Sequence, residues 1–143
     1  MRFALHPRML LVENHGLAAD HTGVDTTTPP QAYVWDCFNT AQAYAAAFEV
    51  HEVALTAGFL PEEATTLSLT LAELAGYAVQ HARGGVASVF FNPGGWRLEV
   101  CDSGPGMAAP PQLKSSGLLA SVRLLARPQG GSLVVAQYQR AEA

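Results

Sequence analysis

Apolar residues recur at helical spacing in two long stretches of the chain. The first runs from Asn39 to Gly58, is rich in alanine, and predicts a helix that Asn39 or Thr40 caps and Gly58 ends. The helical period places five residues, three or four positions apart, on one face of this helix: Tyr44, Ala47, Phe48, His51 and Leu55.

The second stretch begins at Leu60-Pro61-Glu62-Glu63 and ends at Arg83-Gly84-Gly85. A proline in the first turn and two carboxylates at the positive end of the helix dipole favour a helix start here. Its predicted core face again follows the helical period: Leu67, Leu71, Leu74, Ala78, and either His81 or Ala82. Glu73 and Tyr77 are four residues apart and therefore share another face.

Aromatic and β-branched residues predict strands on both sides of these helices. Arg8–Glu13 is a short candidate, and Ala32–Phe38 is a second one. After the helices, Val86–Asn92 and Trp96–Asp102 are expected to form a hairpin around Pro93-Gly94-Gly95, and Ser132–Gln139 the final strand.

A third helix is predicted from Gly117 to Arg127-Pro128, with Leu118, Leu119, Val122, Leu125 and Ala126 turned inward. The order of elements predicts an α+β fold, a two-layer sandwich with a mostly antiparallel sheet and about three helices on one face. Residues 1–31 are expected to form an N-terminal extension, and residues 32–143 a single domain.

Composition narrows the function classes. A chain of 143 residues with a net charge of -4 fits one domain and argues against a general nucleic-acid-binding surface. The sequence contains no apolar run of ~18 residues and no signal-peptide pattern, so we expect a cytoplasmic protein that does not span a membrane. Cys37 and Cys101 fit reduced core residues, and they have no zinc-site spacing with the five histidines.

The candidate chemistry lies where the strand Trp96–Cys101 ends, at Asp102-Ser103-Gly104-Pro105-Gly106-Met107. A carboxylate there can accept a hydrogen bond from an amino group such as that of adenine, and the glycines allow the backbone to approach a flat ligand closely. An ordinary turn would use the same residue types.

Three further blocks accompany this loop, in the order in which they occur in one superfamily. They are Glu73-Leu74-Ala75-Gly76-Tyr77-Ala78-Val79-Gln80-His81-Ala82, Gly117-Leu118-Leu119, and Gly130-Gly131-Ser132. Over residues 39–139 the chain resembles the Bergerat-fold (GHKL) ATPases, and most of all their small bacterial branch of anti-sigma-factor serine kinases and partner-switching regulators. That branch carries a Glu-Leu-x-x-Asn-Ala-x-x-His-Ala helix and an Asp-x-Gly-x-Gly loop.

The resemblance assigns roles residue by residue. Glu73 matches the glutamate that activates the attacking group, Tyr77 falls on the asparagine that holds Mg²⁺, and His81 matches the histidine. A phenol is a poor metal ligand, so no metal site is expected and Mg²⁺ use is doubtful. The remaining candidate nucleotide-binding residues are Asp102, Gly104, Gly106, Met107, Gly117 and Ser132. Leu119 replaces the second glycine of its block. The adenine end of an ATP or ADP site therefore looks intact, and the triphosphate end does not.

Three functions stay open. The first is a degenerate relative that works by binding a sigma factor, an antagonist or its own copy, with weak or no ATP use. The second is a working ATP- and Mg²⁺-dependent serine kinase that phosphorylates an antagonist protein, and the third is a detached sensor-kinase ATPase domain. The resemblance directs attention to the first helix and the adjoining sheet edge, where four aromatic residues would anchor a homodimer or a protein partner: Tyr44, Phe48, Trp35 and Phe38.

Overall fold

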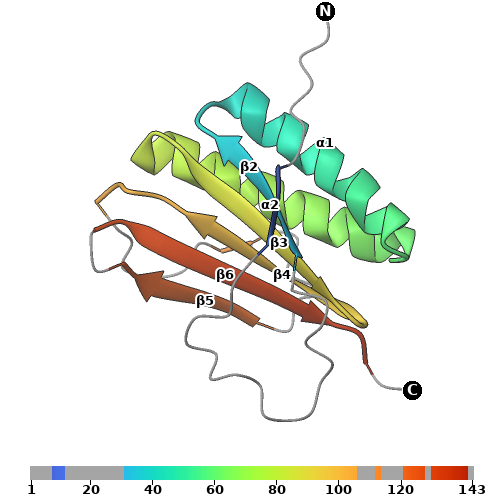
Figure 1. Cartoon of the computed structure of the whole chain (residues 1–143). Helices are drawn as coiled ribbons and strands as arrows, with labels where there is room; N and C mark the ends of the chain where they lie inside the picture. Colours follow the sequence, from blue (N-terminus) through green and yellow to red (C-terminus); the bar gives the residue numbers. More distant parts are fainter. Residues whose placement is uncertain (1–7, 12–30, 106–111, 114–120, 128–129, 142–143) are drawn as a thin grey trace, which may run out of the picture.

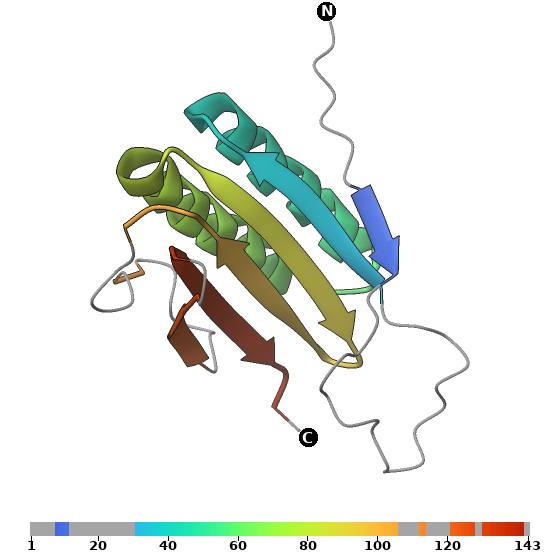
Figure 2. The ribbon, with the colours of Figure 1, turned by 60° about the vertical axis from the view of Figure 1, so that its left-hand side comes forward.

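One antiparallel sheet is covered on one face by two helices in the computed structural model (Figure 1; Figure 2). The structure describes residues 8–11, 31–105, 112–113, 121–127 and 130–141. The elements are β1 (Arg8–Leu11), β2 (Gln31–Cys37), α1 (Thr40–Thr56), α2 (Pro61–Ala82), β3 (Gly85–Asn92), β4 (Gly95–Cys101), β5 (Ser121–Ala126) and β6 (Ser132–Gln139). The predicted α+β two-layer sandwich is therefore confirmed.

The sheet has the strand order β1-β2-β3-β4-β6-β5, with every neighbouring pair antiparallel. From β4 the chain passes to the edge strand β5 and then returns as β6 between the two. Because β6 runs opposite to both neighbours, its start lies beside the end of β4 and the end of β5. This topology brings Asp102, Arg127 and Ser132 to one end of the sheet.

Local sequence explains both helix starts. Asn39 caps α1 by accepting a hydrogen bond from the Gln42 backbone N at 2.8 Å, and the Gln42 side chain accepts one from the Phe38 backbone N at 2.7 Å. At the start of α2, the Glu63 carboxylate accepts a hydrogen bond from the Leu60 backbone N at 2.7 Å. Both predicted helix starts are confirmed.

The core lies between the sheet and the helices, where Trp35, Trp96 and Leu98 from the strands meet Leu67, Leu71 and Leu74 from α2. Cys37 is part of this core, and burial raises the pKa of its thiol to about 12. Cys37 and Cys101 are both free thiols. None of the helices in the described part is long and apolar enough to cross a membrane.

The face of α1 that carries Tyr44, Phe48 and Leu55 is exposed, whereas Ala43, Ala46, Ala47, Val50 and Ala54 are buried. Of the four aromatic residues expected as partner anchors, Tyr44, Phe48 and Phe38 are exposed, but Trp35 is part of the core, so its expected role is wrong. Small side chains let α1 lie close to its neighbours, so the alanines face inward and the large side chains face solvent. On α2 the predicted core residues Leu67, Leu71, Leu74 and Ala78 are buried, but His81 is exposed.

The third predicted helix is also wrong over the residues that the structure describes. Ser121–Ala126 is the edge strand β5, paired with β6, and residues 117–120 lie outside the described residues. Val122 and Leu124 pack against the core, while Arg123 and Leu125 are exposed, which is the period of two of a strand. The described part of the chain thus has two helices rather than about three.

Candidate functional site

Asp102 follows β4 and is fixed by its backbone. Its peptide N donates to the Ser132 carbonyl at 2.9 Å, and its own carbonyl accepts from Nη1 of Arg127 at 2.7 Å. The first hydrogen bond extends the β4–β6 ladder by one residue, and the second connects Asp102 to Arg127, the residue that follows β5. The side chain is only 4% exposed, so Asp102 is a buried carboxylate held by three strands.

The Asp102 carboxylate shapes the loop that follows. Its Oδ1 accepts a hydrogen bond from the Gly104 backbone N at 2.9 Å, two residues on. A carboxylate has a second oxygen, and this is the acceptor that the amino group of adenine would need. The structure therefore combines Asp102, Gly104 and Ser132 in one cluster, as the sequence predicts.

Glycine is required at two positions around Asp102. A Cβ on Gly131, whose φ is +88°, would lie 2.0 Å from the Asp102 carbonyl oxygen. A Cβ on Gly104 would lie 2.5 Å from Cβ of Ala82, at the end of α2. The loop therefore packs directly on α2, one residue beyond His81.

The other predicted residues of the α2 motif lie along one flank of the helix. Glu73, Tyr77 and His81 are four residues apart, and the rings of Tyr77 and His81 stack with their centroids 4.1 Å apart. Glu73 and Tyr77 are half-buried and His81 is exposed. The position that the resemblance gives to a metal-binding amide is thus occupied by an aromatic pair.

These observations test whether a nucleotide and its metal would fit. The buried Asp102 carboxylate and the close-packed Gly104 suit an adenine ring. The stacked rings of Tyr77 and His81 offer a phenol and an exposed imidazole where Mg²⁺ would need an amide oxygen. Across the described ranges, no group of three or more His, Cys, Asp or Glu residues could hold a metal ion. The described residues therefore offer an acceptor for an amino group at Asp102, and at position 77 they offer a phenol in place of the amide that the resemblance expects.

Three predicted nucleotide-binding residues, Gly106, Met107 and Gly117, lie outside the described residues, so their roles stay predictions. The prediction missed Arg127, which it placed at the end of a helix. The signal was the alternation of Val122, Arg123 and Leu124, which indicates a strand ending near Arg127 and thus near Asp102.

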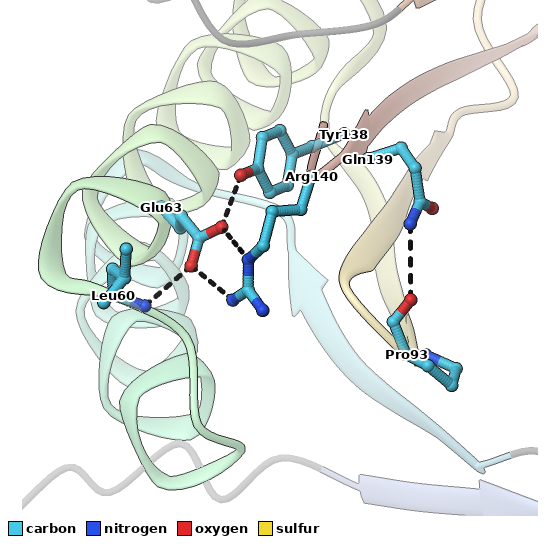
Figure 3. A network of polar contacts seen from close by, with 6 residues as sticks. All are labelled: Leu60, Glu63, Pro93, Tyr138, Gln139 and Arg140. Atoms are coloured by element: carbon cyan, nitrogen blue, oxygen red, sulfur yellow. Dashed lines mark hydrogen bonds and ion pairs between the residues drawn. The ribbon is translucent and has the colours of Figure 1, made fainter. Parts of the chain in front are cut away.

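The sequence also did not predict a polar network at the opposite end of α2 (Figure 3). Glu63, which is 2% exposed, accepts hydrogen bonds from Nη2 of Arg140 at 2.7 Å, from Nε of Arg140 at 2.9 Å, and from the Tyr138 hydroxyl. The Arg140 guanidinium, above all through its hydrogen bonds, lowers the pKa of Glu63 to about 2. Burial and the adjacent Glu63 raise the pKa of Tyr138.

A cleft of about 270 Å³ adjoins this network and is lined by Phe59, Phe91, Gly94 and Arg140 among others. Its charged group, Arg140, already donates two hydrogen bonds to Glu63. The Glu63–Arg140 network therefore fastens the end of β6 to the start of α2, and we assign it a structural role.

No family model and no curated protein matches this chain. Among solved structures, it is similar to the crystal structure of the RsbU and RsbW domains of Rv1364c from Mycobacterium tuberculosis, with a TM-score of 0.60 and 19% sequence identity. The match covers 81% of this chain and 34% of that chain. At this identity the similarity concerns the fold alone, and it agrees with the predicted α+β two-layer sandwich.

Proposed function

We propose that this protein is a regulatory domain of the bacterial partner-switching type, similar to anti-sigma factors, which acts by binding other proteins. Its fold is similar to a structure that contains an RsbW domain, and the sequence motifs resemble anti-sigma-factor serine kinases. The chain spans about a third of that structure, so the activity of a whole protein of that kind is part of the proposal.

The proposal assigns little or no kinase activity to the domain, because the rings of Tyr77 and His81 occupy the position where the resemblance expects a metal ligand. Phosphoryl transfer depends on positioning and on neutralisation of phosphate charge by a metal ion. A phenol stacked on an imidazole at 4.1 Å provides neither the oxygen ligand nor open space at that position. ATP or ADP would then bind weakly, through the adenine end, and Mg²⁺ would add little.

One observation favours an active serine kinase as the second candidate. Glu73 lies one turn before Tyr77 on the same flank of α2, where a residue that activates a hydroxyl group is expected from the resemblance. The Asp102 cluster is also complete in the residues described. An active kinase would need its metal ligands from elsewhere.

Binding of a fluorescent ADP analogue, measured with Mg²⁺ and with a chelator, distinguishes the two candidates. We expect weak binding that changes less than twofold with Mg²⁺. Asp102→Asn should lower the affinity at least fivefold, since it replaces an acceptor of a buried hydrogen bond, worth about 1–3 kcal/mol. Glu99→Gln on β4, the strand that precedes Asp102, is the control. Micromolar ATP affinity that is lost with the chelator would favour the kinase.

Replacement of Tyr77 tests the reason for the missing activity. Tyr77→Asn restores the amide that the resemblance expects, so it should raise Mg²⁺-dependent nucleotide affinity. Tyr77→Phe is the matched control, because it keeps the ring stacked on His81 and supplies no oxygen ligand. Equal affinities of the two variants would mean that the defect lies outside this position.

A further inference from the structure

The outer surface of the two helices carries large apolar side chains that no described element covers. We call this surface the helical face; it consists of Tyr44, Phe48 and Leu55 on α1, Leu69 on α2, and the flanking Glu52 and Glu62. Tyr44 is 67% exposed, Phe48 71% and Leu69 51%. In Figure 2 the helices lie side by side on one face of the sheet, with their outer side turned away from it.

Two contacts align the helices. Oγ of Ser68 donates to the Ala47 carbonyl at 2.7 Å, and His51 lies 3.4 Å from the Thr65 hydroxyl. Phe48 and Leu69, which follow Ala47 and Ser68, are therefore at the same level on the outer side of the pair. Exposed aromatic and aliphatic side chains that gather in this way are typical of protein-binding surfaces.

Small residues accompany these anchors. Ala41 and Ala45 lie on the outer side of α1, and a Cβ on Gly76 of α2 would meet no atom within 4 Å. A partner backbone can therefore approach both helices closely. A third helix laid along a pair of helices, with its apolar residues between large anchors, fits such a surface.

The charge of the helical face indicates which sign of charge the third helix should carry. Between residues 39 and 82 the sequence has five glutamates and no lysine or arginine. Two of them face inward: Glu49 accepts a hydrogen bond from the Trp35 indole at 2.7 Å, and Glu63 binds Arg140. Glu52 and Glu62 are exposed on the same two helices, and Oε1 of Glu52 lies 3.9 Å from Nδ1 of His51. The helical face is thus both apolar and acidic.

This sign argues against three other occupants. Anionic lipid surfaces and nucleic acids would be repelled by the exposed glutamates. A second copy joined by the same face would place its own glutamates against them, because a two-fold interface brings identical patches together. We propose, building on the proposed protein-binding function, that the helical face binds a basic amphipathic helix of a different protein.

Peptide binding tests this proposal with the full chain. The probe is a fluorescent 18-residue peptide designed with leucines on one helical face and lysines on the other. One control peptide keeps the leucines and carries glutamates in place of the lysines, and a second has the composition of the probe in scrambled order. We expect the probe to bind at least tenfold more tightly than both controls, and to bind less tightly at 300 mM than at 50 mM salt.

Two protein variants locate the binding site. Phe48→Ser should weaken binding of the probe about tenfold. Leu125→Ser is the matched control, because Leu125 is also exposed, at 42%, but lies on the edge strand β5. It should change the affinity less than twofold. Circular dichroism establishes that both variants are folded.

Several outcomes would overturn the proposal. These are equal binding of the probe and the scrambled peptide, equal effects of Phe48→Ser and Leu125→Ser, or no binding of the probe. A homodimer that dissociates with Phe48→Ser in sedimentation would assign the helical face to a second copy instead. Because no nucleotide is present, a failure here is distinct from a failure of the nucleotide-binding test.

Discussion

At the N-terminal end of α2, the carboxylate of Glu63 accepts four hydrogen bonds, from Leu60, Tyr138 and twice from Arg140. At the C-terminal end, the carboxylate of Asp102 accepts one hydrogen bond from the described residues, from the backbone of Gly104. Both side chains are almost fully buried. Among the described residues, only the second carboxylate keeps acceptor capacity, and this difference separates a structural ion pair from the proposed nucleotide site.

The surroundings of the two carboxylates differ in the same way. Glu63 is bound by side chains from β6 and by a residue just after it, so its partners fasten two elements that are distant in sequence. Hydrogen bonds to its backbone hold Asp102 in position, so its side chain contacts Gly104 in its own loop and could also accept a hydrogen bond from a ligand. Substitutions at the first end should therefore change stability, and those at the second end should change binding.

The largest effect should come from Glu63→Met. This change leaves the buried Tyr138 hydroxyl and the Leu60 N–H without their acceptor, which costs about 1–3 kcal/mol for each unsatisfied group, whereas Arg140 is exposed and can be solvated. Glu62→Met is the control, since Glu62 directly precedes Glu63 on the helix and is exposed. Urea unfolding measures both. Similar midpoints for the two variants would mean that the Glu63 network contributes nothing to stability.

Titration of the Glu63 carboxylate should make the stability of the protein depend on pH. The pKa of Glu63 is lowered from 4.5 to about 2 in the folded protein, so its contribution is complete above about pH 4.5 and is lost as the pH falls towards 2. The effect should be smaller than that of Glu63→Met, because protonated Glu63 keeps its place and can still accept from Tyr138. Urea midpoints between pH 2 and 5 should fall less steeply in Glu63→Gln than in the native protein.

Substitution of two adjacent glycines near Asp102, Gly130 and Gly131, distinguishes the effect of backbone strain from that of close packing. Gly130 and Gly131 have φ of +95° and +88°, but only a Cβ on Gly131 would contact Asp102, while one on Gly130 would meet nothing within 4 Å. Gly130→Ala should cost about 1 kcal/mol for the left-handed backbone. Gly131→Ala should cost about 1–2 kcal/mol more for the displaced backbone, and it should also weaken adenine nucleotide binding.

Urea unfolding and binding of the fluorescent ADP analogue measure these effects. If Gly130→Ala and Gly131→Ala lose the same stability and keep the same nucleotide affinity, the contact between Gly131 and Asp102 has no role in shaping the site.

Sequence patterns predicted the fold where local signals agreed with packing. The Asn39 cap, the Pro61 start and the turn at Pro93–Gly95 each depend on residues within a few positions, so α1, α2 and the β3–β4 hairpin were predicted correctly. The structure also brings Asp102, Gly104 and Ser132 together, because their positions follow from where strands end, whereas their predicted role in nucleotide binding stays a prediction.

The errors came from packing across long distances in the sequence. The helical period groups Tyr44, Phe48 and Leu55 on one face of α1, but it does not show which face packs against the sheet, where only alanines and Val50 are buried. Leu118 to Ala126 fits a helical period, and pairing with β6 makes its described part a strand. Glu63 and Arg140 are 77 residues apart, so no local pattern joins them.

The smallest effect should come from the contact that the sequence did not predict. Arg127→Gln removes the hydrogen bond to the Asp102 carbonyl, which has a length of 2.7 Å and lies in a partly buried position, so we expect a loss of about 1 kcal/mol. Arg123→Gln is the matched control, because Arg123 is exposed on the same strand, β5. Hydrogen exchange of the Asp102 amide, which donates to Ser132, should become about fivefold faster in Arg127→Gln, the factor that corresponds to about 1 kcal/mol. The exchange rate should not change in Arg123→Gln. If both variants exchange like the native protein, Arg127 does not hold Asp102 in place, and the β4–β6 ladder alone positions the carboxylate.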